Sequence, residues 1–302
     1  MTDFRFGLVH APLTPFVDGR IDFETFGRSI AFHIAQGAEG LAVQTHTGES
    51  VSLTVAERKT LLEFAVGRSG KVPVIANVSE AGTEIAADLA RHAKKVGAAA
   101  IMASVPYYWT PPDSMLVEHF AAIAQAAQLP TFLYNAPEEM ADVAIKTPVV
   151  LALIERTRHL AGLIDTSMDW QFMIEVIADG KRAKNDFQLI AGTEYIISAH
   201  ATGATGLLSS VANVAPGLVR KLYDLAVLEK YLEARPAQVD AAFLYRLFHK
   251  HGVAGLKVGC KLMARDCGQA RPPLPVMDGA IVDEIGNEIA KVAALTTEKR
   301  GW

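Results

Sequence analysis

This chain has few cysteines, no large excess of positive or negative charge, and no long apolar runs. Its two cysteines, Cys260 and Cys267, lack the CxxC spacing of a zinc site and are too few for a disulfide framework, so we expect two packed thiols. A formal net charge of -4, without runs of like charge, gives no basic surface for nucleic acid or an anionic membrane. No stretch of about eighteen uncharged apolar residues is present to cross a membrane.

The N-terminal sequence, MTDFRFGLVHAPL, lacks the charged segment and long apolar segment of a secretory signal peptide. We therefore expect a cytoplasmic protein that binds small neutral or acidic molecules, and neither nucleic acid nor membrane. Half of the 302 residues are hydrophobic and 21% are charged, so the chain can bury a large core.

Short apolar runs alternate with longer helical patterns eight times, and no Pro/Gly-rich linker interrupts them. The runs, which we predict to be strands, are Phe6–Ala11, Leu41–Gln44, Val72–Ala76, Ala99–Ala103, Thr131–Tyr134, Leu160–Ile164, Gln188–Ala191 and Gly206–Ser209. Eight such units predict a parallel sheet closed into an α/β TIM (β/α)8 barrel over residues 1–228. Further helical patterns follow, so residues 229–302 are expected to form a C-terminal helical extension packed on the barrel.

Several helices have recognisable starts and stops. Thr54 with Glu57 forms a capping box for a helix to about Val66, and Thr147 before Pro148 is typical of an N-cap. Glycines expected to stop helices are Gly37, Gly67 and Gly97. Other predicted helices are Glu84–Val96, Ser114–Ala127, Asp169–Ala178, Pro216–Leu228, Ala237–Lys250, Leu256–Arg265 and Asp278–Leu295.

In a barrel of this kind, the loops that follow the strands face the active site. Two of these loops carry distinctive residues. Thr47-Gly48-Glu49 places a glycine in a tight turn whose backbone N–H groups can bind a carboxylate, although a plain turn has the same composition. Tyr134 at a strand end offers a phenol for proton transfer, or an aromatic wedge with its hydroxyl in water.

The loop motifs, taken in order, resemble those of the dihydrodipicolinate synthase and N-acetylneuraminate lyase family. They are APLTPF (11–16), THTGES (45–50), PYYWTPP (106–112), LYNAP (133–137), GLIDTS (162–167), AGTE (191–194) and GLLSSVANVAP (206–216). The resemblance covers nearly the whole chain. It implies a 2-oxo-acid lyase or aldolase, usually a homotetramer, that holds pyruvate as a Schiff base on a lysine.

Three functional features of that family match residues of this chain. They are the tyrosine of its YN.P motif at Tyr134, the second tyrosine of PYY at Tyr108, and the carboxylate-binding turn at Thr47-Gly48. Three positions depart from the family. Ile164 stands at the position of the Schiff-base lysine, His46 replaces a hydroxyl of the proton relay, and Glu139 replaces an arginine that meets an acidic substrate.

No other lysine is expected to replace the missing amine. Lys181 and Lys184 precede the seventh strand and so belong to the opposite face of the barrel, Lys257 lies in the C-terminal extension, and Lys146 opens the fifth helix. A Schiff base requires a neutral amine, which a lysine achieves by desolvation and isoleucine cannot provide.

The first hypothesis is therefore an enzyme that acts on a small 2-oxo or 2-hydroxy acid without an imine. Tyr134 is its acid/base, His46 is its partner unless that histidine only fills space, and Tyr108 completes the catalytic set. The substrate-binding residues that we predict are Thr47, Gly48, Glu139, Asp165, Gly192, Glu194 and Leu208. No cofactor is expected. A divalent metal held by His46, Glu49, Asp165 or Glu194 could replace the imine as electron sink, but these residues form no spaced ligand motif, so it is a minor variant of this hypothesis.

The second hypothesis is a catalytically silent paralogue that binds a small metabolite or regulates an active relative. Both hypotheses predict self-association as a dimer or tetramer. The aromatic run Tyr107-Tyr108-Trp109 lies on a loop, where such apolar surface is rarely left to water in a monomer.

Overall fold

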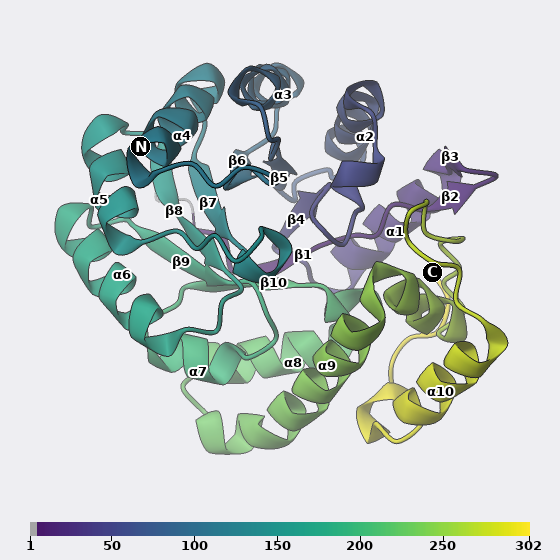
Figure 1. Cartoon of the computed structure of the whole chain (residues 1–302). Coiled ribbons are helices and arrows are strands. Elements are labelled where there is room, and N and C mark those ends of the chain that lie inside the picture. The colour runs from purple at the N-terminus through teal and green to yellow at the C-terminus, as the bar shows by residue number, and fades with distance from the viewer. Residues whose placement is uncertain (1–4) are drawn as a thin grey trace.

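The structure, a computed structural model, describes residues 5–302. Eight parallel strands close into a barrel in the order β1-β10-β9-β8-β7-β6-β5-β4 (Figure 1). These strands are β1 (Leu8–His10), β4 (Gly40–Val43), β5 (Val74–Asn77), β6 (Ala100–Ser104), β7 (Thr131–Asn135), β8 (Leu160–Asp165), β9 (Gln188–Ala191) and β10 (Gly206–Ser209). The predicted barrel is confirmed, because each predicted strand overlaps its observed counterpart.

Helices on the outside of the barrel connect the strands, as Figure 1 shows from above the mouth. They are α1 (Phe23–Ala35), α2 (Val55–Arg68), α3 (Thr83–Val96), α4 (Asp113–Ala127), α5 (Thr147–Arg156), α6 (Trp170–Ala183), α7 (Ile196–Ala201) and α8 (Pro216–Val227). A small antiparallel hairpin of β2 (Phe16–Val17) and β3 (Arg20–Ile21) precedes α1. The sequence pattern did not predict this hairpin, whose strands have only two residues each.

The helix ends agree with the sequence in most places. The capping box of Thr54 and Glu57 is present at α2, and Gly37 and Gly97 adopt left-handed φ angles of 85° and 89° after their helices. Two predictions were wrong. Gly67 lies inside α2, which continues to Arg68 because the glycine keeps helical geometry. At α5 the N-cap is Lys146 rather than Thr147, so Pro148 is the second helical residue and not the first.

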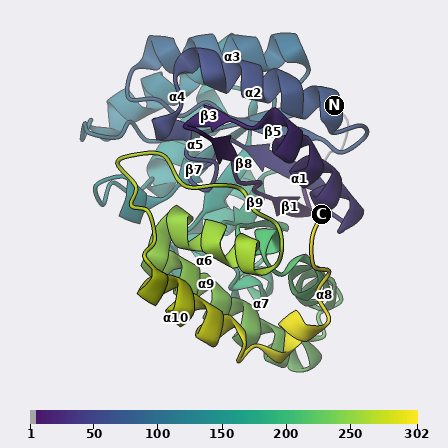
Figure 2. The same ribbon diagram turned by 90° about the vertical axis from the view of Figure 1, so that its right-hand side faces the viewer.

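The C-terminal extension consists of α9 (Tyr231–Leu262), α10 (Gly279–Ile289) and a short 3₁₀ helix at Ala293–Thr296. In Figure 2, α9 and α10 pack together below the barrel strands. The sequence predicted two helices separated by several residues, whereas α9 bends at the single residue Gly252, with φ 63° and ψ -165°. Cys260 and Cys267 are free and buried, as expected. None of the helices in residues 5–302 has the length and apolarity needed to cross a membrane.

Side chains alternate along each strand between the barrel interior and the surrounding helices. On β8, Leu163 belongs to the large apolar cluster under the helices, while Ile164 belongs to a separate cluster inside the barrel. Tyr134 of β7 and Leu208 of β10 belong to the same interior cluster. The pleat of β8 therefore turns Ile164 into the barrel and its neighbour Asp165 outward.

Candidate active site

A cavity of about 320 Å³ lies at the carboxyl ends of the strands, where barrel enzymes hold their substrates. Loops after the strands form one side of its wall, and α9 forms the other. The lining residues are His46, Thr47, Tyr134, Glu138, Glu139, Thr166, Gly192, Ser210, Tyr245, Phe248, His249, Gly252, Val253 and Leu256. The volume is at the small end of the range for ligand pockets, so it suits one small molecule.

A larger cavity of about 640 Å³ lies at the opposite end of the barrel. Residues at the amino ends of strands line it, among them Leu160 of β8 and Gln188 of β9, together with Lys184 and Asp186. Lys184 and Asp186 pair with each other at 2.5 Å. Because loops at this end of a barrel stabilise the fold, the smaller cavity is the candidate active site.

Tyr134 points its phenol into the smaller cavity from the end of β7. Its side chain is only 6% exposed, and its hydroxyl has no hydrogen-bond partner among the described residues. Desolvation, and next the charge of Glu139, raise the pKa of Tyr134 above its usual value. The phenol therefore keeps its proton at neutral pH and can donate it, or a hydrogen bond, to a ligand oxygen.

The Thr47-Gly48 turn lies at the mouth of β4. The N–H groups of Gly48 and Glu49 donate to the carbonyls of Thr45 and His46, so they are used within the turn itself. A Cβ on Gly48 would lie 3.1 Å from the Cα of Gln44, which explains the glycine. These hydrogen bonds leave three donors for the predicted anion site: the backbone N–H groups of His46 and Thr47 and the Thr47 hydroxyl. None of the three has a hydrogen-bond partner within residues 5–302.

Two carboxylates, Glu138 and Glu139, enter the cavity wall from the loop after β7. Glu138 lies 3.2 Å from Nε2 of His249 on α9, with both side chains more than half exposed. Glu139 has no ion-pair partner in the described part of the chain. Its Oε2 atom is shielded from solvent and accepts no hydrogen bond there.

Five of the predicted site residues line this cavity: His46, Thr47, Tyr134, Glu139 and Gly192. Gly48 lies in the turn beside it. The other residues of the predicted set, Tyr108, Asp165, Glu194 and Leu208, are absent from the wall.

Asp165 and Glu194 are held by hydrogen bonds that come mainly from neighbouring strands and loops. Asp165 accepts hydrogen bonds from Asn135 at 2.6 Å and Ser167 at 2.9 Å. Burial raises its pKa to about 6 despite these bonds. Oε1 of Glu194 accepts from the Ser209 hydroxyl and the Val211 N–H, each at 2.8 Å, and desolvation raises the pKa of this carboxyl. Both carboxylates therefore order the mouth of the barrel from behind the wall.

Glu49 turns away from the cavity and joins the barrel to the C-terminal extension. Its Oε1 lies 2.7 Å from Nζ of Lys257 on α9, and both side chains are almost completely buried. The N–H of Arg271 donates to Oε2. No three His, Cys, Asp or Glu side chains within residues 5–302 are grouped as metal ligands, because Glu49, Asp165 and Glu194 each have separate partners.

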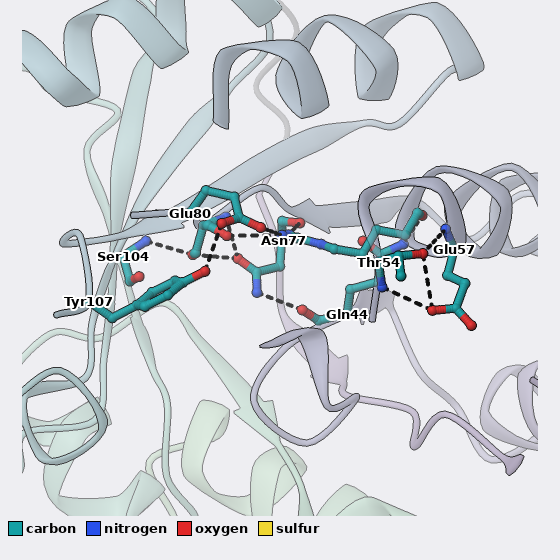
Figure 3. Close-up of polar contacts among 9 residues, drawn as sticks. Gln44, Thr54, Glu57, Asn77, Glu80, Ser104 and Tyr107 are labelled. Carbon is teal, nitrogen blue, oxygen red and sulfur yellow. Dashed lines mark hydrogen bonds and ion pairs between the residues drawn. The ribbon is translucent and has the colours of Figure 1, made fainter. Parts of the chain in front are cut away.

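The aromatic loop after β6 is anchored through its first tyrosine. The Tyr107 hydroxyl donates to Glu80 at 2.7 Å, as Figure 3 shows, and Glu80 pairs with the buried Arg58 at 2.8 Å. Desolvation and this carboxylate raise the pKa of Tyr107 to about 12. Tyr108 has a φ angle of 75° and is 84% exposed, with its ring against that of Trp109. The loop therefore presents Tyr108 to solvent in the single chain.

Comparison with known proteins decides the family. A model of the dihydrodipicolinate synthetase family matches residues 5–291 of this chain. The chain belongs to this family. The resemblance of its loop motifs is therefore confirmed over almost the whole length.

Relatives within the dihydrodipicolinate synthetase family align end to end. A 4-hydroxy-tetrahydrodipicolinate synthase from Aquifex aeolicus is 31% identical over 274 residues, which cover 90% of this chain and 92% of that protein. A protein of the same name from Rhizobium meliloti is 33% identical, covering 89% and 91%. The crystal structure of dihydrodipicolinate synthase from Aquifex aeolicus is similar with a TM-score of 0.90 and 28% identity, over 95% of this chain and 98% of that one.

Among residues 5–302 of this member of the dihydrodipicolinate synthetase family, no lysine or arginine lines the cavity. Lys257 is committed to Glu49, and Lys146 pairs with Asp113 at 3.1 Å on the surface. Lys184 lines the cavity at the other end of the barrel. None of these amines lies beside Tyr134, where Ile164 is fully buried.

Sequence reasoning missed the contribution of α9 to the wall of this cavity. Tyr245, Phe248, His249, Gly252, Val253 and Leu256 form one side of the cavity. Their spacing of three and four residues indicates one face of a helix, which is a signal in the sequence. Periodicity alone, however, does not show which partner that face covers. Glu138, Thr166 and Ser210 lay in loops already assigned to the mouth and were not selected.

Proposed function

We propose that this chain is a lyase or aldolase-type enzyme that acts on a small 2-oxo or 2-hydroxy acid without a lysine Schiff base. The observation that carries the proposal is the pairing of Tyr134 and Ile164. A buried, protonated phenol without a protein partner faces the cavity, and a fully buried aliphatic side chain occupies the adjacent strand end. The polarising group at this place is therefore a hydrogen-bond donor and not an amine.

The arrangement supports a retro-aldol cleavage of a 4-hydroxy-2-oxo acid. The substrate carboxylate accepts hydrogen bonds from the N–H groups of His46 and Thr47 and the Thr47 hydroxyl, and Tyr134 donates to the 2-oxo oxygen. His46 takes the proton of the 4-hydroxyl group as the C3–C4 bond breaks. The electron pair of that bond passes to the enolate, whose oxygen Tyr134 stabilises. C4 leaves as an aldehyde, and protonated His46 returns the proton to C3, which gives pyruvate and regenerates the base.

The exposed aromatic loop supports self-association as a second part of this proposal. Tyr108 and Trp109 expose apolar rings on a loop that Tyr107 holds in place. Such a surface suits burial against a second copy of the chain, as a dimer or within a tetramer. By resemblance to the family, Tyr108 then reaches the neighbour's cavity and completes its catalytic set.

The test of the proposed activity compares Tyr134→Phe with Tyr223→Phe. Both tyrosines are 6% exposed, but Tyr223 lies on α8 away from the cavity. Pyruvate release from 4-hydroxy-2-oxo acids is followed with lactate dehydrogenase, and ligand binding is followed by thermal shift. We expect Tyr134→Phe to lower kcat by about 10²–10⁴-fold with binding retained, and Tyr223→Phe to leave it unchanged. Binding to the wild type without turnover of any such acid would instead favour the silent paralogue.

A further inference from the structure

The charges on the cavity wall are unbalanced. Glu138 and Glu139 supply two carboxylates, and no lysine or arginine lines the cavity to neutralise them. The other titratable groups that face it are His46, His249 and the phenols of Tyr134 and Tyr245. His249 is directed at Glu138 near the rim, which leaves Glu139 as the carboxylate without a protein counter-charge.

Glu139 is set up to receive a donor that the protein does not supply. Its Oε2 atom is shielded from solvent and has no hydrogen-bond partner within residues 5–302. A shielded carboxylate oxygen costs stability unless a hydrogen-bond donor satisfies it. Tyr134, a residue that is only 6% exposed and whose hydroxyl has no hydrogen-bond partner in the described chain, lines the same cavity. Two independent polar groups thus await a ligand in one small space.

The two cavity phenols respond to this negative charge. After desolvation, Glu139 is the next cause that raises the pKa of Tyr134. Desolvation also raises the pKa of Tyr245, followed by the charges of Glu194, Glu139 and Glu138. Both phenols stay neutral, so they add no positive charge to the wall. The ring of Tyr245 in addition offers an aromatic surface, which attracts cations.

We propose that Glu139, with Glu138 and Tyr245, forms a subsite for a cationic group at the far end of the substrate. This inference rests on the proposed function, because it takes the carboxyl end of a 2-oxo or 2-hydroxy acid to lie at the Thr47 turn. The far end then carries an amino or guanidinium group, which pairs with the Glu139 carboxylate where it borders the cavity. A second carboxylate at this end is repelled, so dicarboxylic 2-oxo acids are poor ligands.

The experiment measures binding of three 2-oxo acids by isothermal titration calorimetry. They differ at the far end: 2-oxo-5-guanidinopentanoate is cationic, 2-oxohexanoate is neutral and 2-oxoglutarate is anionic. We expect the cationic acid to bind at least about tenfold more tightly than the neutral one, and the anionic acid to bind most weakly. Raising the salt concentration should reduce the preference.

Variants locate the preference on one carboxylate. Glu139→Gln should bring the cationic acid to the affinity of the neutral acid while leaving the neutral acid unchanged. Glu138→Gln is the matched control, because Glu138 lies nearer the solvent and has His249 beside it, so the preference should fall less. Equal binding of cationic and neutral acids by the wild type, or an unchanged preference in Glu139→Gln, overturns the subsite.

A second probe separates this inference from the proposed function. If none of the three acids binds, the 2-oxo-acid function fails, and butylguanidinium is then compared with butyrate by thermal shift. Stabilisation of the wild type by butylguanidinium, lost in Glu139→Gln, supports the subsite by itself. No stabilisation, or equal stabilisation of both proteins, overturns it.

Discussion

Tyr134 on β7 and Ile164 on β8 are register partners inside the barrel, so their side chains lie side by side at the mouth. The pair places a proton donor next to an aliphatic group. The proposed chemistry follows from this pairing, because the Tyr134 phenol has to polarise the 2-oxo group without help from an amine.

Ile164→Lys by itself should not produce an efficient aldolase. The new amine would lie in the apolar barrel interior, where desolvation lowers its pKa, and Asp165 is bonded to Asn135 and Ser167 on the other side of the strand. A slow imine with pyruvate is therefore expected. Condensation with aspartate semialdehyde should remain poor, because Glu139 repels the carboxylate of this substrate. For two like charges about 4 Å apart, the repulsion is roughly 1 kcal/mol in water and about 4 kcal/mol at an effective dielectric near 20.

Comparison of Ile164→Lys with Ile164→Lys/Glu139→Arg separates the two effects. Pyruvate trapping should be similar in both, and condensation should rise only in the double variant. If the single variant already condenses as fast as a lysine-bearing relative, Glu139 does not face the second substrate.

Asp165 should make stability depend on pH. Its pKa is raised to about 6 in the folded chain from 3.8, so the folded protein binds more protons than the unfolded chain between these values. Stability therefore falls as the pH rises through this window, by roughly 3 kcal/mol at about 1.4 kcal/mol per unit. Asp165→Asn should lose this dependence and exceed the wild type in free energy of unfolding above about pH 6. Urea titrations at several pH values measure it.

The control for this prediction is Asp142→Asn. Asp142 is exposed, and its φ angle of 61° suits asparagine. Its variant should follow the wild type across the same pH range. The raised pKa would be contradicted if the free energy of unfolding of the wild type, measured relative to that of Asp165→Asn, stayed constant or rose between pH 4 and 6.

The sequence predicted the barrel because its signals are local and repeated. Apolar runs, caps and glycine stops each report on a few neighbouring residues, and eight repetitions leave few alternative topologies. Which side chains reach the cavity depends on finer geometry. Asp165 was expected in the wall, but strand alternation turns it outward once Ile164 points inward. The alternation of side chains along a strand is readable in the sequence, and it places Asp165 on the opposite face from Ile164.

Other site residues could not be located from the sequence. Glu194 accepts hydrogen bonds from the Ser209 hydroxyl and the Val211 N–H. These donors follow it by 15 and 17 residues, on another strand and loop. Leu208 points into the barrel interior and does not reach the cavity wall. The side of the wall supplied by α9 depends on how a C-terminal helix packs, which no local pattern specifies.

The buried pair of Glu49 and Lys257 should be sensitive to removal of one partner. Lys257→Met leaves the Glu49 carboxylate buried beside only the Arg271 N–H, so the free energy of unfolding should fall by about 3–5 kcal/mol. Glu49→Gln/Lys257→Met should recover part of this loss because no charge remains buried. Urea unfolding of the three proteins measures the effect. A single variant within 1 kcal/mol of the wild type would show that the pair does not stabilise the turn.

Light scattering at micromolar concentration should show a dimer or tetramer. Tyr108→Ala/Trp109→Ala should shift the protein toward a monomer, since these rings are the exposed apolar part of the loop. Leu232→Ala, at an exposed apolar position on α9, is the control and should not change the assembly. A wild-type protein that is monomeric under these conditions would refute the proposed interface.

The central claim is catalysis without a covalent imine, and borohydride trapping tests it most directly. The wild-type protein is incubated with pyruvate, reduced with sodium borohydride, and examined by intact mass spectrometry and peptide mapping. A lysine-bearing relative is treated in parallel as the positive control. The account predicts no adduct on this chain, because no lysine lines the cavity and Ile164 occupies the strand end beside Tyr134. A reduced pyruvate adduct on any lysine at the barrel mouth would contradict it.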